Sequence, residues 1–185
     1  MKKISSFAGF LSLVVFSQIY GVDTVEKSNI NYGYQKYGEE TMDSVQGNGM
    51  VILEGTKVLG LVQVNGSLNA EESAIDSLQI NGKTELRNCL ITNTASINGS
   101  LTADNTKFQK ELSVASQKII LRMCSLKSLT IREVTGFTGA QVVDLRSGTR
   151  VSGPIVVEAG NGEIWISSNS EISLDQVSGA KVYKK

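Results

Sequence analysis

The residue types that usually perform chemistry are few in this sequence of 185 residues. It contains no histidine and two cysteines, Cys89 and Cys124. Without histidine the chain lacks the usual general base, the commonest metal ligand and the partner that activates a serine or cysteine nucleophile. We therefore expect no enzymatic activity, no bound metal and no cofactor.

Paired carboxylates are the one remaining arrangement that could break a bond, because two of them suffice to hydrolyse a glycoside. The acids are scattered, and only Glu71, Glu72 and Asp76 come close together in the sequence. A solvated surface explains this group more simply than a catalytic pair does, because acidic side chains are mostly exposed.

Trp165 is the side chain best suited to bind a ligand at the surface. It is the single tryptophan and stands between Ile164 and Ile166. If both isoleucines of a strand point inward, the indole points outward. An exposed tryptophan is typical of a binding site for a partner or a sugar ring. In the opposite register Trp165 belongs to the core, and the sequence leaves both possibilities open.

The elements that must position these residues follow from a short repeat. A short motif with the pattern apolar, polar, apolar starts at residues 45, 62, 78, 95, 112 and 129, so its period is 16 or 17 residues. Several copies end in Asn-Gly, as in Val62-Gln63-Val64-Asn65-Gly66. A fixed short period predicts one structural unit that is copied along the chain.

Each repeat carries three short apolar groups, which predict about three strands. Stacked repeats align these groups in columns and predict an all-β, single-domain parallel β-solenoid with rungs of about 17 residues. An antiparallel meander is the alternative, because Asn-Gly is also a hairpin signal. The solenoid is preferred because the whole register recurs. In a solenoid, glycine allows the left-handed backbone conformation that a sharp corner needs. We then expect Asn65, Asn81 and Asn98 to form a hydrogen-bonded ladder.

The repeat argues against a disulfide between Cys89 and Cys124. They are 35 residues apart, which is two repeats plus one residue. Two rungs correspond to roughly 9.6 Å, whereas a disulfide needs Cα atoms within about 7 Å. The offset of one residue also predicts that Cys89 is buried and that Cys124 is partly exposed. We expect two free thiols, with Cys124 the faster to react.

The regular rungs occupy residues 45–131. Residues 132–185 contain strand-like runs without the fixed period and are predicted to be irregular C-terminal rungs and a cap. The lysine-rich residues 181–185 disfavour pairing of the last edge with another copy. Residues 22–44 are polar and predict a flexible N-terminal arm or cap.

Residues 1–21 have the pattern of a secretory signal peptide: Lys2 and Lys3 precede a mostly apolar segment, and Gly21 lies at a plausible cleavage point. Cleavage after Ser17 and an uncleaved anchor are the alternatives. Cleavage after Gly21 leaves 16 basic and 18 acidic residues without a block of like charge. We therefore expect no nucleic-acid partner, no membrane span in the mature chain, and export to the periplasm, cell envelope or exterior.

The 17-residue rung with its Ile/Val-Asn-Gly-Ser/Lys corners resembles that of the bactofilins, the polymer-forming cytoskeletal proteins of bacteria. The resemblance covers residues 45–131. It implies a right-handed parallel β-helix and end-to-end polymerisation. Bactofilins are usually cytoplasmic, whereas this chain begins with an export signal, so the resemblance points to an exported variant.

Together these observations predict an exported, non-enzymatic structural or adhesive β-helix protein. Its expected partners are further copies of itself, end to end, or a component of the cell envelope. The alternative is a carbohydrate-binding or minimal carbohydrate-active protein, for which Trp165 is the predicted surface site.

Overall fold

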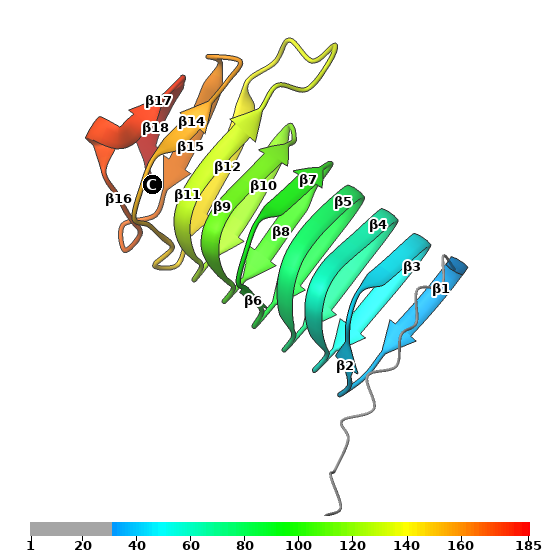
Figure 1. Cartoon of the computed structure of the whole chain (residues 1–185). Helices are drawn as coiled ribbons and strands as arrows, with labels where there is room; N and C mark the ends of the chain where they lie inside the picture. The colour runs from blue at the N-terminus through cyan, green and yellow to red at the C-terminus, as the bar shows by residue number, and fades with distance from the viewer. Residues whose placement is uncertain (1–30) are drawn as a thin grey trace, which may run out of the picture.

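The computed structural model describes residues 31–185. The predicted signal peptide and residues 22–30 of the predicted arm lie outside the described residues. The described chain coils through about 9 turns of about 17 residues (Figure 1). Strands of successive turns pair in parallel and in register, so that Val62 lies beside Val45 and Leu78 beside Val62. The predicted parallel β-solenoid is confirmed, and the antiparallel meander is wrong.

Each turn has three faces. The first face contains β7 (Ala95–Asn98), β14 (Ile155–Val157), β17 (Val177–Ser178) and parts of β3 (Val45–Glu54), β4 (Lys57–Glu71), β5 (Ala74–Arg87), β9 (Lys107–Ala115) and β11 (Ser125–Arg132). The second face contains β1 (Asn31–Tyr37), β8 (Leu101–Asp104), β10 (Lys118–Arg122), β12 (Gln141–Arg146), β15 (Gly162–Ile166), β18 (Ala180–Lys184) and the ends of β3, β4 and β5. The third face contains β2 (Thr41–Met42), β6 (Leu90–Ile91), β13 (Arg150–Val151), β16 (Glu171–Ile172) and the starts of β4, β5, β9 and β11. A 3-10 turn, η1 (Leu174–Gln176), precedes β17 in the last turn.

The core is one continuous column of apolar side chains along the axis. Alternation directs every second residue of a strand inward, so Val62 and Val64 of the first face and Leu68 of the second are fully buried. The matching residues of the neighbouring turns, such as Leu78 and Ile80, stack directly on them. Each turn therefore buries its apolar side chains against one another and against the turns next to it.

The corner between the first and second faces is built by the Asn-Gly pairs. The asparagine side chains form the expected ladder, in which Asn65 Nδ2 donates to Asn48 Oδ1 at 3.0 Å, Asn81 to Asn65 at 2.8 Å and Asn98 to Asn81 at 2.7 Å. The glycine that follows has a positive φ, 142° at Gly82. A Cβ atom there would lie 1.8 Å from the carbonyl oxygen of the glycine in the turn before, so no other residue fits without a shift.

The regularity breaks at residues 115–118. The register pairs Ile119 with Leu101, so this corner holds one more residue than the corner before it. The extra residue is recovered between Leu126 and Ser128, where the pairing of β11 with β9 shifts by one. The next turn is wider because a loop at residues 133–140 separates β11 from β12 (Figure 1).

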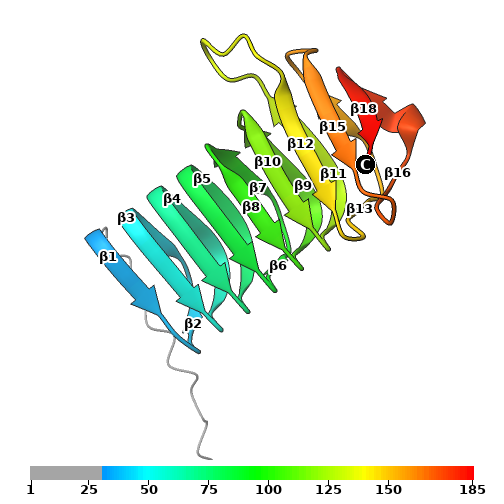
Figure 2. The same ribbon diagram turned by 180° about the vertical axis from the view of Figure 1, so that it is seen from behind.

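At each end of the solenoid, the second face finishes with a strand. Residues 31–37 form β1, which pairs with β3, and residues 41–42 form β2, which pairs with β4. The described part of the predicted arm or cap is thus a partial first turn of the solenoid and not a flexible arm. At the other end β18 pairs with β15. Figure 2 shows the second face running from β1 to β18. No helix within residues 31–185 is long and apolar enough to cross a membrane.

Candidate functional site

Trp165 points outward from the second face. Ile164 and Ile166 on either side of it are buried, and the indole is half-buried. Its ring stacks on that of Tyr183, the matching residue of the next strand, with ring centroids 4.6 Å apart and an interplanar angle of 19°. Since Tyr183 covers one face of the indole, less of that ring is available for stacking on a sugar.

Charged groups complete this aromatic cluster. The Lys185 ammonium lies 5.4 Å from the centroid of the indole, and the Trp165 Nε1–H donates to Glu163 at 3.4 Å. The buried Asp144 lies beside Trp165 in the preceding turn and accepts from Arg146 Nε at 2.8 Å and from Lys185 Nζ at 3.1 Å. Hydrogen bonds from Arg146 and then Lys185 hold the pKa of Asp144 below its usual range despite burial. This arrangement ties the last residues of the chain to the two turns before them.

Both thiols are free and buried. The prediction of two free thiols is confirmed, but the prediction that Cys124 is partly exposed is wrong, because its exposed fraction is 2%. The extra residue at 115–118 moves Cys124 into the inward column of Cys89 and leaves Met123 outside, 52% exposed. Burial raises the pKa of both thiols, that of Cys124 to about 11, which makes them poor nucleophiles.

The acids that lie close together in the sequence lie on different parts of the turn. Glu71 ends β4 and Glu72 turns the corner that follows it, whereas Asp76 comes after the inward Ile75 at the far end of the third face. Asp76 accepts hydrogen bonds from Ser77 at 2.8 Å and Thr92 at 3.0 Å, and these bonds lower its pKa. Residues 31–185 contain no group of three His, Cys, Asp or Glu side chains that could hold a metal ion.

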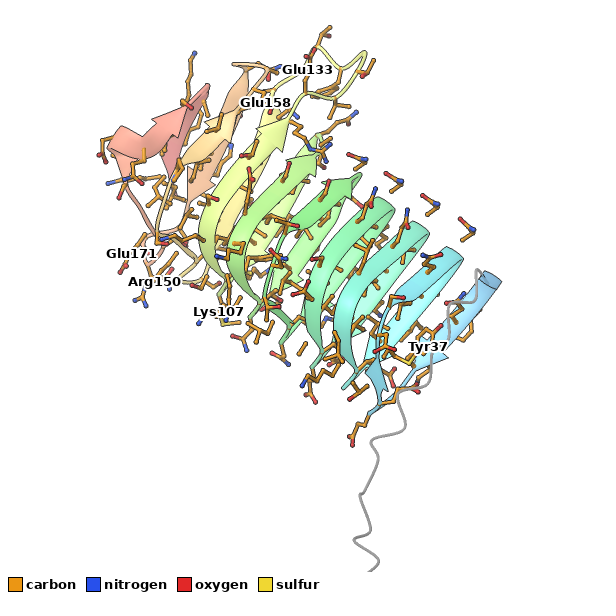
Figure 3. All side chains as sticks on the ribbon, in the orientation of Figure 1. Tyr37, Lys107, Glu133, Arg150, Glu158 and Glu171 are labelled. Carbon is orange, nitrogen blue, oxygen red and sulfur yellow. The ribbon has the colours of Figure 1, made fainter. Side chains whose placement is uncertain are left out.

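A groove of about 740 Å³ opens where the asparagine ladder stops. Its walls are the two corners at residues 98–100 and 115–118 and the start of the loop at residues 132–135. Figure 3 shows Glu133 on this protruding loop. The volume lies within the range of sites for small ligands, and polar and apolar atoms contribute about equally to the lining.

Arg132 organises this groove. Ala115 takes the next place in the asparagine column, and Arg132 takes the place after it. Because Ala115 is small, the Arg132 guanidinium reaches back past it, and Nη2 donates to Asn98 Oδ1 at 2.7 Å and to Ile97 O at 3.1 Å. Gln141, itself buried, donates from Nε2 to the carbonyl oxygens of Ser116 at 3.0 Å and Arg132 at 2.8 Å, which fixes two walls of the groove together.

This groove was not among the sites predicted from the sequence. The sequence nevertheless marks the position of the groove. Ala115-Ser116 stands where the regular repeat has Asn-Gly, and the inward apolar residue of the next strand is Ile119 instead of residue 118. A lost corner motif together with a shifted apolar position marks the turn at which the solenoid departs from its own pattern.

Comparison of the chain with protein-family models, with curated proteins and with solved structures found no match to it.

Proposed function

We propose that this chain is an exported, non-enzymatic structural protein whose solenoids assemble end to end with further copies. The observation that carries the proposal is the pair of strand edges at the two ends of the second face. Among the described strands, β1 pairs only with β3 and β18 only with β15. A strand edge without a neighbour is a template for pairing with another chain.

The last turn also leaves part of the core open. Ile172, Val177, Ala180 and Val182 pack against the core but are only partly buried. Since β1 and β18 belong to the same face, a second copy with its β1 beside β18 would continue the parallel strand pairing of that face and cover these residues. Such a head-to-tail contact does not close on itself and produces filaments.

The charges at the two ends favour this head-to-tail arrangement. Lys181, Lys184 and Lys185 are exposed at the last strand, whereas Glu39 and Glu40 are exposed in the first turn. Opposite charges attract across a head-to-tail contact, and two copies of the lysine-rich end repel each other. The sequence predicted that these lysines disfavour pairing of the last edge with another copy; a partner end that carries Glu39 and Glu40 offsets this effect by opposite charge. The resemblance to bactofilins in rung length and corners supports assembly as well.

The test is light scattering and negative-stain microscopy on residues 22–185 over a range of protein concentrations. We expect filaments at low ionic strength that shorten as salt is added, because salt screens exposed charges. Replacing Lys181 and Lys184 with glutamate should abolish them. Mixing that variant with a Glu39→Lys, Glu40→Lys variant should restore contacts between unlike copies.

The matched control replaces Lys110 and Lys127, two exposed lysines on the side of the solenoid, with glutamate. It changes the net charge by the same amount and should leave the filaments intact. A monomer at every concentration, or equal loss of assembly in the control, would contradict end-to-end assembly. Trp165 as a surface for a carbohydrate remains a prediction, tested by binding of soluble glycans to Trp165→Ala.

A further inference from the structure

The groove beside Arg132 combines an anchored cation with an unused hydrogen-bond donor. Nη2 of the guanidinium is held by Asn98, Ile97 and, at 3.3 Å, Ser96. Its Nε–H is buried and has no partner within residues 31–185. A buried donor without an acceptor is costly unless something supplies one. The guanidinium is thus held in place in the wall of the groove.

A second buried polar atom without a hydrogen-bond partner in the described part of the chain belongs to Gln141, which holds two walls of the groove together. The Gln141 side chain is 1% exposed, and its Nε2 holds the backbone of Ser116 and Arg132. Its Oε1 is buried and has no partner in the described part of the chain. Two unsatisfied polar atoms in one small region are uncommon in a native structure.

The charges of the groove select the kind of ligand. Lys118 on the corner and Arg132 beneath the loop contribute two positive charges, and Glu133 contributes one negative charge. None of the three forms a salt bridge within residues 31–185. The net charge of one suits a single carboxylate better than a phosphate dianion, which Glu133 would repel. Arginine recognises carboxylates with particular strength.

The remaining lining groups suit hydroxyls. Ser100, Gln117 and Thr135 offer both donors and acceptors around the two cations. We propose that this groove binds a carboxylate-bearing sugar unit, such as a uronic acid within an acidic polysaccharide. Arg132 and Lys118 hold the carboxylate, and the hydroxyl and amide side chains hold the ring hydroxyls. The site lies on the side of the solenoid, so it is independent of end-to-end assembly.

The experiment titrates the full chain with a tetramer of galacturonic acid and follows binding by calorimetry. The neutral galactose tetramer and inorganic phosphate are the comparison ligands. We expect binding of the uronic acid tetramer and none of either comparison ligand. Lys118→Gln should weaken binding about tenfold through loss of a charge-assisted hydrogen bond. Lys127→Gln, at an exposed lysine outside the groove, should leave binding unchanged.

A second variant tests the geometry without removing a charge. Ala115→Asn restores the missing member of the asparagine column and fills the gap through which Arg132 reaches back. We expect it to fold and melt as the parent does but to lose the uronic acid tetramer. Equal binding of the neutral tetramer or of phosphate would overturn the proposal. So would a parent chain that binds nothing, or full binding by both Lys118→Gln and a folded Ala115→Asn.

Discussion

At the corner between the second and third faces, a residue of left-handed backbone conformation is followed by a small buried side chain. Glu72, Asn88, Asn105 and Met123 have φ between 45° and 52°. The next residue in each case, Ser73, Cys89, Thr106 or Cys124, donates its hydroxyl or thiol to the carbonyl oxygen two residues before it, at 2.8–3.2 Å. The cysteines thus take the place of serine and threonine at a corner that needs a small donor.

This role predicts that neither thiol reacts in the folded protein. Burial raises the pKa of Cys124 to about 11, so very little thiolate is present at pH 8 and the reagent cannot reach it. We expect no modification by a disulfide reagent at pH 8 until the protein is unfolded in guanidinium. Met123→Cys places a thiol one residue away at an exposed position and should react at once. If Cys124 were modified as fast as the introduced thiol in that variant, its burial would be contradicted.

At the scale of the elements, the corners between the first and second faces depend on glycine. At Gly82 both the positive φ and the contact with the preceding turn exclude a side chain. The clash is with backbone, which cannot move aside as a side chain can.

We expect Gly82→Ala to lower the free energy of unfolding by more than about 1 kcal/mol, because its native backbone is incompatible with alanine. Gly38→Ala is the matched control, since a Cβ atom at Gly38 would have nothing within 4 Å, and the substitution should change stability by about 0.5 kcal/mol or less. Urea denaturation of both variants measures the difference. Equal stability of the two would refute a close contact at residue 82.

The regular elements could be predicted from the sequence because each turn repeats the same local solution. Alternation placed Val62 and Val64 inward, and Asn-Gly placed the corner and its ladder. Cys124 could not be placed, because the repeat from residue 112 to residue 129 has the normal length. Its extra residue at one corner is cancelled at another, and only strand pairing reveals both shifts. The groove was missed for a different reason, because its signal, Ala115-Ser116 in place of Asn-Gly, does not reveal that Arg132 fills the gap.

At the scale of the molecule, a solenoid is stabilised between neighbouring turns, so its ends separate more easily than its middle. The last turn is held by Lys185 through Asp144 and by the stack of Tyr183 on Trp165. Asp144 stabilises the folded state above the unfolded carboxyl pKa of about 3.9. Because its folded pKa is lowered, that contribution is lost as pH falls through the folded value.

We therefore expect the fluorescence of Trp165, the single tryptophan, to change below about pH 4 before circular dichroism reports loss of the sheet. Asp144→Asn should remove this early step because it cannot titrate. Glu163→Gln should retain it, although Glu163 accepts the indole hydrogen bond. Loss of the early step in Glu163→Gln, or its persistence in Asp144→Asn, would assign the transition to another group.

The asparagine ladder also has a direction. Every amide donates toward the N-terminal end of the solenoid, from Asn98 to Asn81, Asn81 to Asn65 and Asn65 to Asn48. Aligned amide dipoles in series polarise one another and leave a partial positive charge at the Asn48 end and a partial negative charge at Asn98. The Arg132 cation sits at the negative end. The row of asparagines therefore has the electrostatics of a helix whose C-terminus is met by a positive side chain, built on the outside of a β-sheet.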